Sequence, residues 1–142
     1  MTPTLGGRIQ TRWLLVLLVG VPWTVVVVPF LLPFAGGGDL GDVYGVAFLA
    51  LLLVGVLGTG WELGYHALMQ LRWEKDWLAL FGLVTVVNEF LLVLLVLVLL
   101  DRPTSFAVWL HFATTWFWIW FVSNGPLRVL LPRWRFRGGR VV

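Results

Sequence analysis

The residue of this chain most able to do chemistry is a carboxyl group in the middle of a long apolar run. Glu89, preceded by Asn88, interrupts a mostly apolar stretch that extends from Trp77 to Leu100. In a membrane-spanning helix, a carboxyl at that depth costs about 2.5–3.5 kcal/mol on insertion scales unless it is paired, neutralised or hydrated. Glu89 is therefore the first candidate for a functional group.

Other polar side chains at helical spacing are candidates to meet Glu89. Thr85 lies one turn before it on the same helical face. In the next apolar run, His111 and Thr115 share a face, and a rise of about 1.5 Å per residue places them at a depth compatible with Glu89. The sequence therefore predicts an intramembrane polar cluster made of Glu89, Asn88, Thr85, His111 and Thr115.

A second polar face lies on the preceding apolar run. Thr59, Glu62 and His66 follow one another at intervals of three and four residues, where we expect the inner membrane boundary. If these helices converge, polar groups extend in steps from Glu62 to Glu89 and could carry protons or a small cation. A satisfied interhelical hydrogen-bond cluster explains the same residues at least as well, and the sequence leaves both interpretations open.

The sequence predicts neither a catalytic site nor a metal site. The chain contains no cysteine, which excludes disulfides and thiolate chemistry. It has no nucleophile elbow, no phosphate-binding loop and no HExxH motif. Glu62 and His66 supply only two possible ligands, and His111 is expected at the opposite membrane boundary. We therefore expect no enzyme activity, no metal and no cofactor.

The composition determines which elements position these residues. Apolar residues make up 60% of the 142 residues and charged residues only 12%, which is too few for a soluble domain of this size. Four apolar runs are long enough to span a bilayer, since a span needs about 20 such residues. They predict an all-α, polytopic membrane protein with one integral membrane domain over residues 1–142, built as a four-helix bundle with helices at 13–34, 43–71, 77–100 and 106–123 and a basic tail at 124–142.

Three prolines interrupt the first of these runs. Pro22, Pro29 and Pro33 predict a kink or a break toward its outer end. The run is also too long for a cleavable signal peptide, whose apolar core has about 7–15 residues. We therefore expect a retained first helix.

The distribution of cations predicts the orientation. Of the ten Lys and Arg residues, only Arg102 falls in a connection on the outer side. The positive-inside rule then predicts a multi-pass protein of the cell membrane with both termini in the cytoplasm. The basic tail alternates Arg with large apolar residues, which favours contact with anionic lipid headgroups or docking of a partner over binding of nucleic acid. Its candidate contact residues are Arg128, Arg133, Trp134, Arg135, Arg137 and Arg140.

Two functions fit this pattern. The first is a subunit or scaffold of a larger membrane assembly, with no catalytic activity of its own, which contacts the lipid bilayer and a membrane-protein partner or further copies of itself. The short loops and the closely spaced Trp116, Trp118 and Trp120 favour it. The alternative is a small proton- or cation-coupled transporter or channel centred on Glu89.

Overall fold

The protein is all-α. A computed structural model describes residues 4–71 and 79–131, with side chains described outside 79–84. Its helical segments are α1 (Leu5–Leu15), the π-helix η1 (Val16–Gly20), α2 (Val21–Leu31), the 3-10 helix η2 (Leu32–Phe34), α3 (Leu40–Gln70), α4 (Ala79–Leu99), α5 (Phe106–Asn124) and α6 (Pro126–Leu130).

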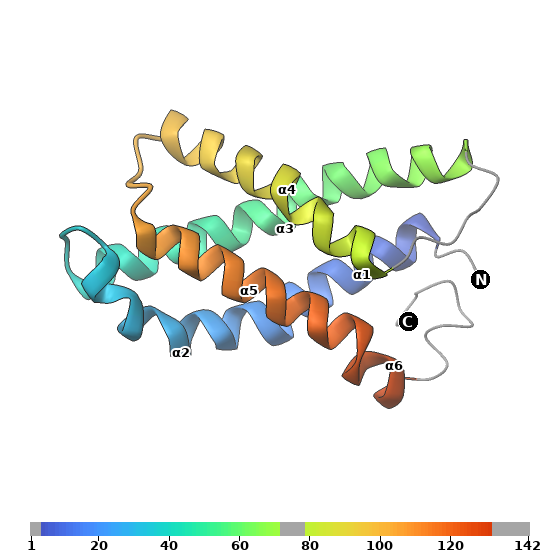
Figure 1. Ribbon diagram of the computed structural model, residues 1–142, viewed down its shortest axis with the longest axis horizontal. Coiled ribbons are helices and arrows are strands. Elements are labelled where there is room, and N and C mark those ends of the chain that lie inside the picture. Colours follow the sequence, from blue (N-terminus) through green and yellow to red (C-terminus); the bar gives the residue numbers. More distant parts are fainter. Residues whose placement is uncertain (1–3, 72–78, 132–142) are drawn as a thin grey trace.

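These segments form four long helical rods that run along one axis of the molecule (Figure 1). The connections after η2 and after α4 lie together at one end, which we call the loop end. The starts of α1 and α4 and the ends of α3 and α5 lie toward the other end, which we call the terminal end. Since α3 contacts α1, α2, α4 and α5, it is the element that joins the bundle together.

Three of the rods are long and apolar enough to cross a membrane. They comprise Leu5–Phe34, Leu40–Gln70 and Phe106–Leu130. In α4, the apolar stretch with described side chains is Thr85–Leu99. The predicted all-α class is therefore confirmed, and the predicted membrane character is supported by three candidate spans.

The first helix begins at Leu5, eight residues before the predicted start at Trp13. Thr4 is its N-cap, and the Thr4 hydroxyl accepts a hydrogen bond from the Gly7 amide at 3.2 Å. Such a cap satisfies an amide that has no partner within the helix. The prediction followed hydropathy alone, so it placed Arg8 and Arg12 before the helix rather than inside it.

Of the other predicted boundaries, the start at Trp77 lies outside the described residues, and the rest lie within three residues of the observed ones. The second helix begins at Leu40 instead of Val43, because Asp39 and Asp42 form a capping box that starts the helix earlier. The fourth ends at Asn124, and Pro126 opens the short α6.

Near the prolines the first rod changes from α-helix to π-helix and then to 3-10 helix, but it continues to Phe34. A π-helical segment, Val16–Gly20, precedes Pro22 and widens the turn where the proline ring would otherwise meet the carbonyl four residues earlier. Pro29 has no N–H to offer the Val25 carbonyl. The Tyr44 hydroxyl of α3 donates to that carbonyl instead, at 2.8 Å. A neighbouring helix thus supplies the missing hydrogen bond.

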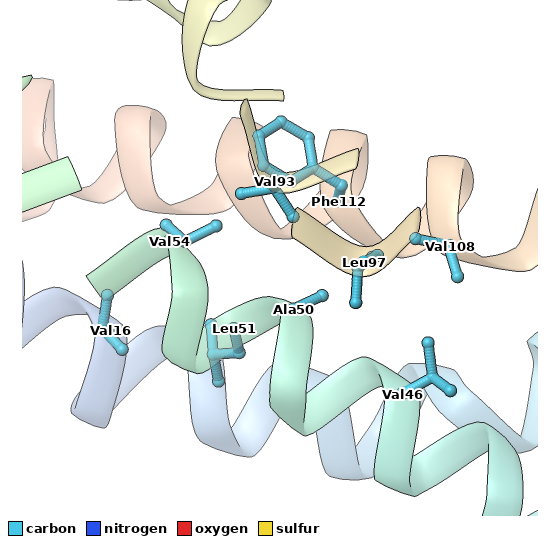
Figure 2. Close-up of a cluster of buried hydrophobic side chains, with 9 residues drawn as sticks. All are labelled: Val16, Val46, Ala50, Leu51, Val54, Val93, Leu97, Val108 and Phe112. Carbon is cyan, nitrogen blue, oxygen red and sulfur yellow. The ribbon is translucent and has the colours of Figure 1, made fainter. Parts of the chain in front are cut away.

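The apolar core lies along the middle of the bundle. Figure 2 shows its side chains converging from η1, α3, α4 and α5. The members of this core are Val16, Val46, Ala50, Leu51, Val54, Val93, Leu97, Val108 and Phe112. In a lipid environment, such tight packing holds helices together, because burial of apolar surface provides little driving force there. The core separates two groups of polar residues.

Candidate functional site: a charged cluster at the terminal end

The partner of Glu89 is an arginine from the first helix. The Glu89 side chain is only 2% exposed. Its two carboxylate oxygens accept hydrogen bonds from Arg12, one from Nη2 at 2.7 Å and one from Nη1 at 2.9 Å. This two-point pairing of a planar guanidinium with a carboxylate is the strongest geometry available to an ion pair. It joins α1 to α4.

A second ion pair extends the cluster to α3. Arg12 Nη2 also donates to Glu62 Oε1 at 2.9 Å. The other Glu62 oxygen accepts from Arg8 Nε, one turn before Arg12 on α1. Two arginines therefore face two carboxylates, and the formal charges cancel. We call Arg8, Arg12, Glu62 and Glu89 the charged cluster.

Two glycines of α3 allow the first helix to come this close. Gly58 lies directly under the Arg12 guanidinium, where a Cβ atom would overlap Nη1. Gly55 lies under the Trp13 ring, whose atoms would stand 2.8–3.3 Å from a Cβ at that position. The Trp13 indole N–H then donates to the Thr59 hydroxyl at 3.2 Å. The small residues thus create the space into which the long side chains of α1 extend.

The geometry of the charged cluster favours a fixed arrangement over an exchangeable one. A buried ion pair is strongly destabilised when one partner is removed, because the remaining charge has no compensation. Both oxygens of Glu89 are bonded to Arg12. Arg12 Nη1 also lies 3.4 Å from the Val54 carbonyl of α3. The arrangement ties α1, α3 and α4 together and leaves Glu89 firmly paired.

A second, uncharged group of polar residues lies toward the loop end. The His111 Nε2 atom on α5 is 2.9 Å from the hydroxyl of Thr24 on α2, and both residues are buried. Next to them, the Trp23 indole N–H donates to Thr114 at 3.1 Å. We call Trp23, Thr24, His111 and Thr114 the neutral cluster.

The two clusters are separated along the first helix. Arg12 and Thr24 are twelve positions apart, or about 18 Å at 1.5 Å per residue. The core residue Val16 lies between them. Within the described part of the chain, Glu89 is hydrogen-bonded to Arg12 and His111 to Thr24, and the Thr115 hydroxyl has no hydrogen-bond partner. The residues predicted as one cluster are therefore divided between two places.

The remaining predicted site residues have separate environments. Thr85 is half-buried and Asn88 is exposed. Thr115 is buried, and its hydroxyl has no hydrogen-bond partner among the described residues. His66 lies near Gln70, with 3.4 Å between its Nε2 atom and the Gln70 side-chain nitrogen.

In the basic tail, Arg128 donates to the Asn124 side chain at 2.9 Å. The other tail candidates, from Arg133 to Arg140, lie outside the described residues. Their predicted contact with lipid headgroups or a partner stays a prediction.

The residues of the charged cluster that were missed from the sequence are Arg8 and, at its centre, Arg12. Its position beside Trp13, at the edge of the apolar run, made it one of several boundary cations. Thr4 is the signal that could have placed it, because a Thr at that position permits an N-cap two turns earlier. Arg12 then lies inside the helix, four residues after Arg8 and on the same face.

Comparison with protein-family models, curated proteins and solved structures finds no match for this chain. Among the described residues, no group of three or more His, Asp or Glu side chains is arranged to hold a metal ion. The functional argument therefore rests on the two polar clusters and on the surface of the bundle.

Proposed function

We propose that this chain is a small integral membrane protein that serves as a subunit or scaffold of a larger membrane assembly, without catalytic activity of its own. The observation that carries the proposal is the pairing of both Glu89 oxygens with Arg12. A carboxylate held in this way stabilises the bundle and is poorly suited to receive a substrate. In this proposal α4 is a fourth span, since its 21 residues measure about 32 Å at 1.5 Å per residue.

The surface of α5 supports a role in contacting a partner. Phe117, Trp118 and Phe121 are between 36% and 50% exposed. Phe117 and Phe121 stack at 6.3 Å between ring centroids, and Trp118 meets Phe121 edge-on at 5.8 Å. A continuous aromatic surface of this kind suits packing against another membrane helix. Lipid contact alone requires indoles mainly near the membrane boundaries.

Site-specific crosslinking tests this role. Because the chain contains no cysteine, an introduced cysteine is its one reactive thiol. Phe121→Cys places a single thiol on the aromatic surface of α5. Leu95→Cys, at an exposed position of α4, is the matched control. With a thiol-reactive benzophenone in native membranes, we expect Phe121→Cys to give a protein adduct and Leu95→Cys to give none. The wild-type protein should also co-purify with the same partner in mild detergent. Isolation as a monomer, with no adduct from either position, would remove the proposal.

The alternative is a proton- or cation-coupled transporter or channel centred on Glu89. It has less support, because Arg12 already neutralises this carboxylate. A flux assay in proteoliposomes on the wild type and on Glu89→Gln separates the two functions. Flux that is present in the wild type and lost in the variant would favour transport. Equal flux in both proteins, or none in either, would exclude it.

We further propose that both termini lie in the cytoplasm, as the cation distribution predicts. Thr104→Cys at the loop end and Arg128→Cys at the terminal end are both exposed positions. With a membrane-impermeant maleimide on intact cells, Thr104→Cys should be labelled and Arg128→Cys should be protected until the cells are lysed. The reverse pattern would overturn the orientation.

A further inference from the structure

The outward face of α5 is apolar along most of the helix. Phe106, Ala113, Phe117 and Phe121 are exposed, and Leu110 between them is half-buried. Their spacing of three and four residues places all five side chains on one side of the helix. We call these five residues the α5 seam.

The bundle holds α5 by its two flanks. Figure 1 shows α5 between α2 and α4. On one flank, the Trp23 indole of α2 donates to Thr114 at 3.1 Å. On the other, Phe90 of α4 meets Trp109 edge-on, with 4.7 Å between ring centroids. Because both neighbouring helices contact the flanks, the seam between them points away from the bundle.

The chemistry of the seam suits a partner identical to itself. α5 contains no charged residue, so two copies do not repel each other there. Copies that insert in one orientation and are related by a two-fold axis along the membrane normal bring each seam residue to its own counterpart at equal depth. Phe, Leu and Ala all pack well against themselves. Selective recognition of a different protein commonly uses polar or charged groups, and the seam offers none.

Ala113 forms a notch in the seam. It lies between the larger Leu110 and Phe117, close to the middle of α5. A small residue where two membrane helices cross lets their backbones approach closely. The large side chains above and below the crossing then interlock, as ridges do in grooves.

The exposed aromatic area is large enough for a dimer. Five aromatic side chains on the seam and at its two edges are 36–60% exposed: Phe106, Trp109, Phe117, Trp118 and Phe121. Since a Phe or Trp side chain buries about 150–250 Å², together they present roughly 500 Å² per copy. Two copies would bury about 1,000 Å², which is the lower bound for a specific interface.

We propose that the α5 seam binds the seam of a second copy of this chain, in a parallel two-fold dimer with Ala113 at the crossing point. This inference rests on the proposed function, because it identifies the partner that the aromatic surface of α5 contacts. The charged cluster lies inside each copy and takes no part in the contact, since its formal charges already cancel.

Disulfide formation tests the symmetry of the contact, because in a parallel two-fold dimer each seam residue meets itself. Ala113→Cys is oxidised with copper phenanthroline in native membranes. We expect it to migrate at twice the mass of the chain and to return to the monomer on reduction. A disulfide requires Cα atoms about 4.4–6.8 Å apart, so only a close crossing gives this product.

Val26→Cys is the matched control. Val26 is 57% exposed on α2, and its position two residues after Thr24 places it on the side of α2 away from α5. Both cysteines lie about 10–12 Å from the loop-end limits of their rods. Val26→Cys should remain monomeric, and equal yields of dimer from the two variants would contradict the seam.

A bulky residue in the notch tests the close approach. Donor and acceptor dyes on Thr104→Cys report dimerisation by energy transfer in phosphatidylcholine vesicles of increasing protein content. Ala113→Ile should weaken the dimer at least about tenfold, because it overpacks the crossing point. Val26→Ile should leave the transfer unchanged. Both positions are exposed, so both variants should fold, which the helical circular dichroism signal checks. Equal transfer in Ala113→Ile and in the unsubstituted seam would overturn the crossing at Ala113.

The mass of the Phe121→Cys adduct separates this inference from the proposed function. An adduct at twice the mass of the chain, together with the Ala113→Cys disulfide, would support both. An adduct of a different mass without the Ala113→Cys disulfide would overturn the second copy and leave the proposed function standing. No adduct and no disulfide would remove both.

Discussion

The charged cluster at the terminal end and the neutral cluster toward the loop end differ in how their buried polar side chains find partners. At the terminal end, Arg12 brings Glu62 and Glu89 together from two other helices. Toward the loop end, Thr24 pairs with His111 and also with a carbonyl of its own helix. A buried charge requires an opposite charge, which only another side chain supplies. A hydroxyl can use a carbonyl one turn away.

This difference has a consequence for stability. The charged cluster is closed, because both Glu89 oxygens are bonded, and it should dominate the cohesion of α1, α3 and α4. The neutral cluster remains open, because His111 Nδ1 and the nearby Thr115 hydroxyl have no partners among the described residues. An uncharged group tolerates such incompleteness at a smaller cost.

The largest expected effect comes from removing the central cation. Arg12→Ala leaves Glu62 and Glu89 facing each other with less compensation, and should cost about 3–5 kcal/mol of unfolding free energy. Reversible unfolding in mixed micelles with increasing denaturing detergent measures it. The double variant Arg12→Met with Glu89→Met should recover much of the loss, since apolar residues replace a buried pair well. A loss below about 1 kcal/mol in Arg12→Ala would show that the charged cluster does not dominate.

A glycine pair tests the close approach that the charged cluster requires. Gly58→Ala introduces a methyl group where the Arg12 guanidinium lies, and overpacking of this kind costs about 1–3 kcal/mol. Gly60→Ala is the matched control on the same helix, since no side chain lies within 4 Å of a Cβ there. It should stabilise by about 0.5–1 kcal/mol. The same unfolding assay measures both, and equal effects at the two positions would contradict the described packing.

The neutral cluster should respond less strongly. Thr24→Val keeps the shape of the side chain and removes the acceptor of His111 Nε2. Interhelical hydrogen bonds within membranes average about 0.6 kcal/mol and reach about 1.7, so a loss in this range is expected in the unfolding assay. The ¹⁵N resonances of His111 should change at the same time. A loss as large as that of Arg12→Ala would remove the distinction between the two clusters.

The smallest expected effect is at the edge of the neutral cluster. Thr114→Val removes the acceptor of the half-buried Trp23 indole, at an expected cost of about 0.6 kcal/mol or less. Trp23 fluorescence cannot be isolated among ten tryptophans, so the unfolding assay is again the measurement. A cost above that of Thr24→Val would mean that the indole pair, and not His111, holds α2 to α5.

The helices could be predicted well because hydropathy and capping are local properties. The ends of α4 and α5 follow from the run of apolar residues and from Pro126. The start of α1 was missed, because its first two turns contain Gly6, Gly7 and Arg8, which hydropathy does not recognise as helical. Its Thr4 cap is local too, so this error was avoidable.

The candidate site could be predicted only in part. Glu89 was recognisable as costly from its apolar neighbours, and Glu62 as a member of a polar face. Their partner was not, because 77 residues separate Arg12 from Glu89. The prediction grouped Glu89 with His111 because it assumed that α4 and α5 lie side by side with their polar faces together, so that residues at compatible depths meet.

The sequence by itself determined that this chain forms long apolar helices and that Glu89 needs compensation, because helix formation and desolvation depend on residues close in the chain. Only the tertiary structure decided what supplies the compensation. That choice depends on how the helices are rotated and shifted against one another, and on Gly58 leaving room for the Arg12 side chain. The same packing separated His111 from Glu89 and left its Nδ1 without a protein partner.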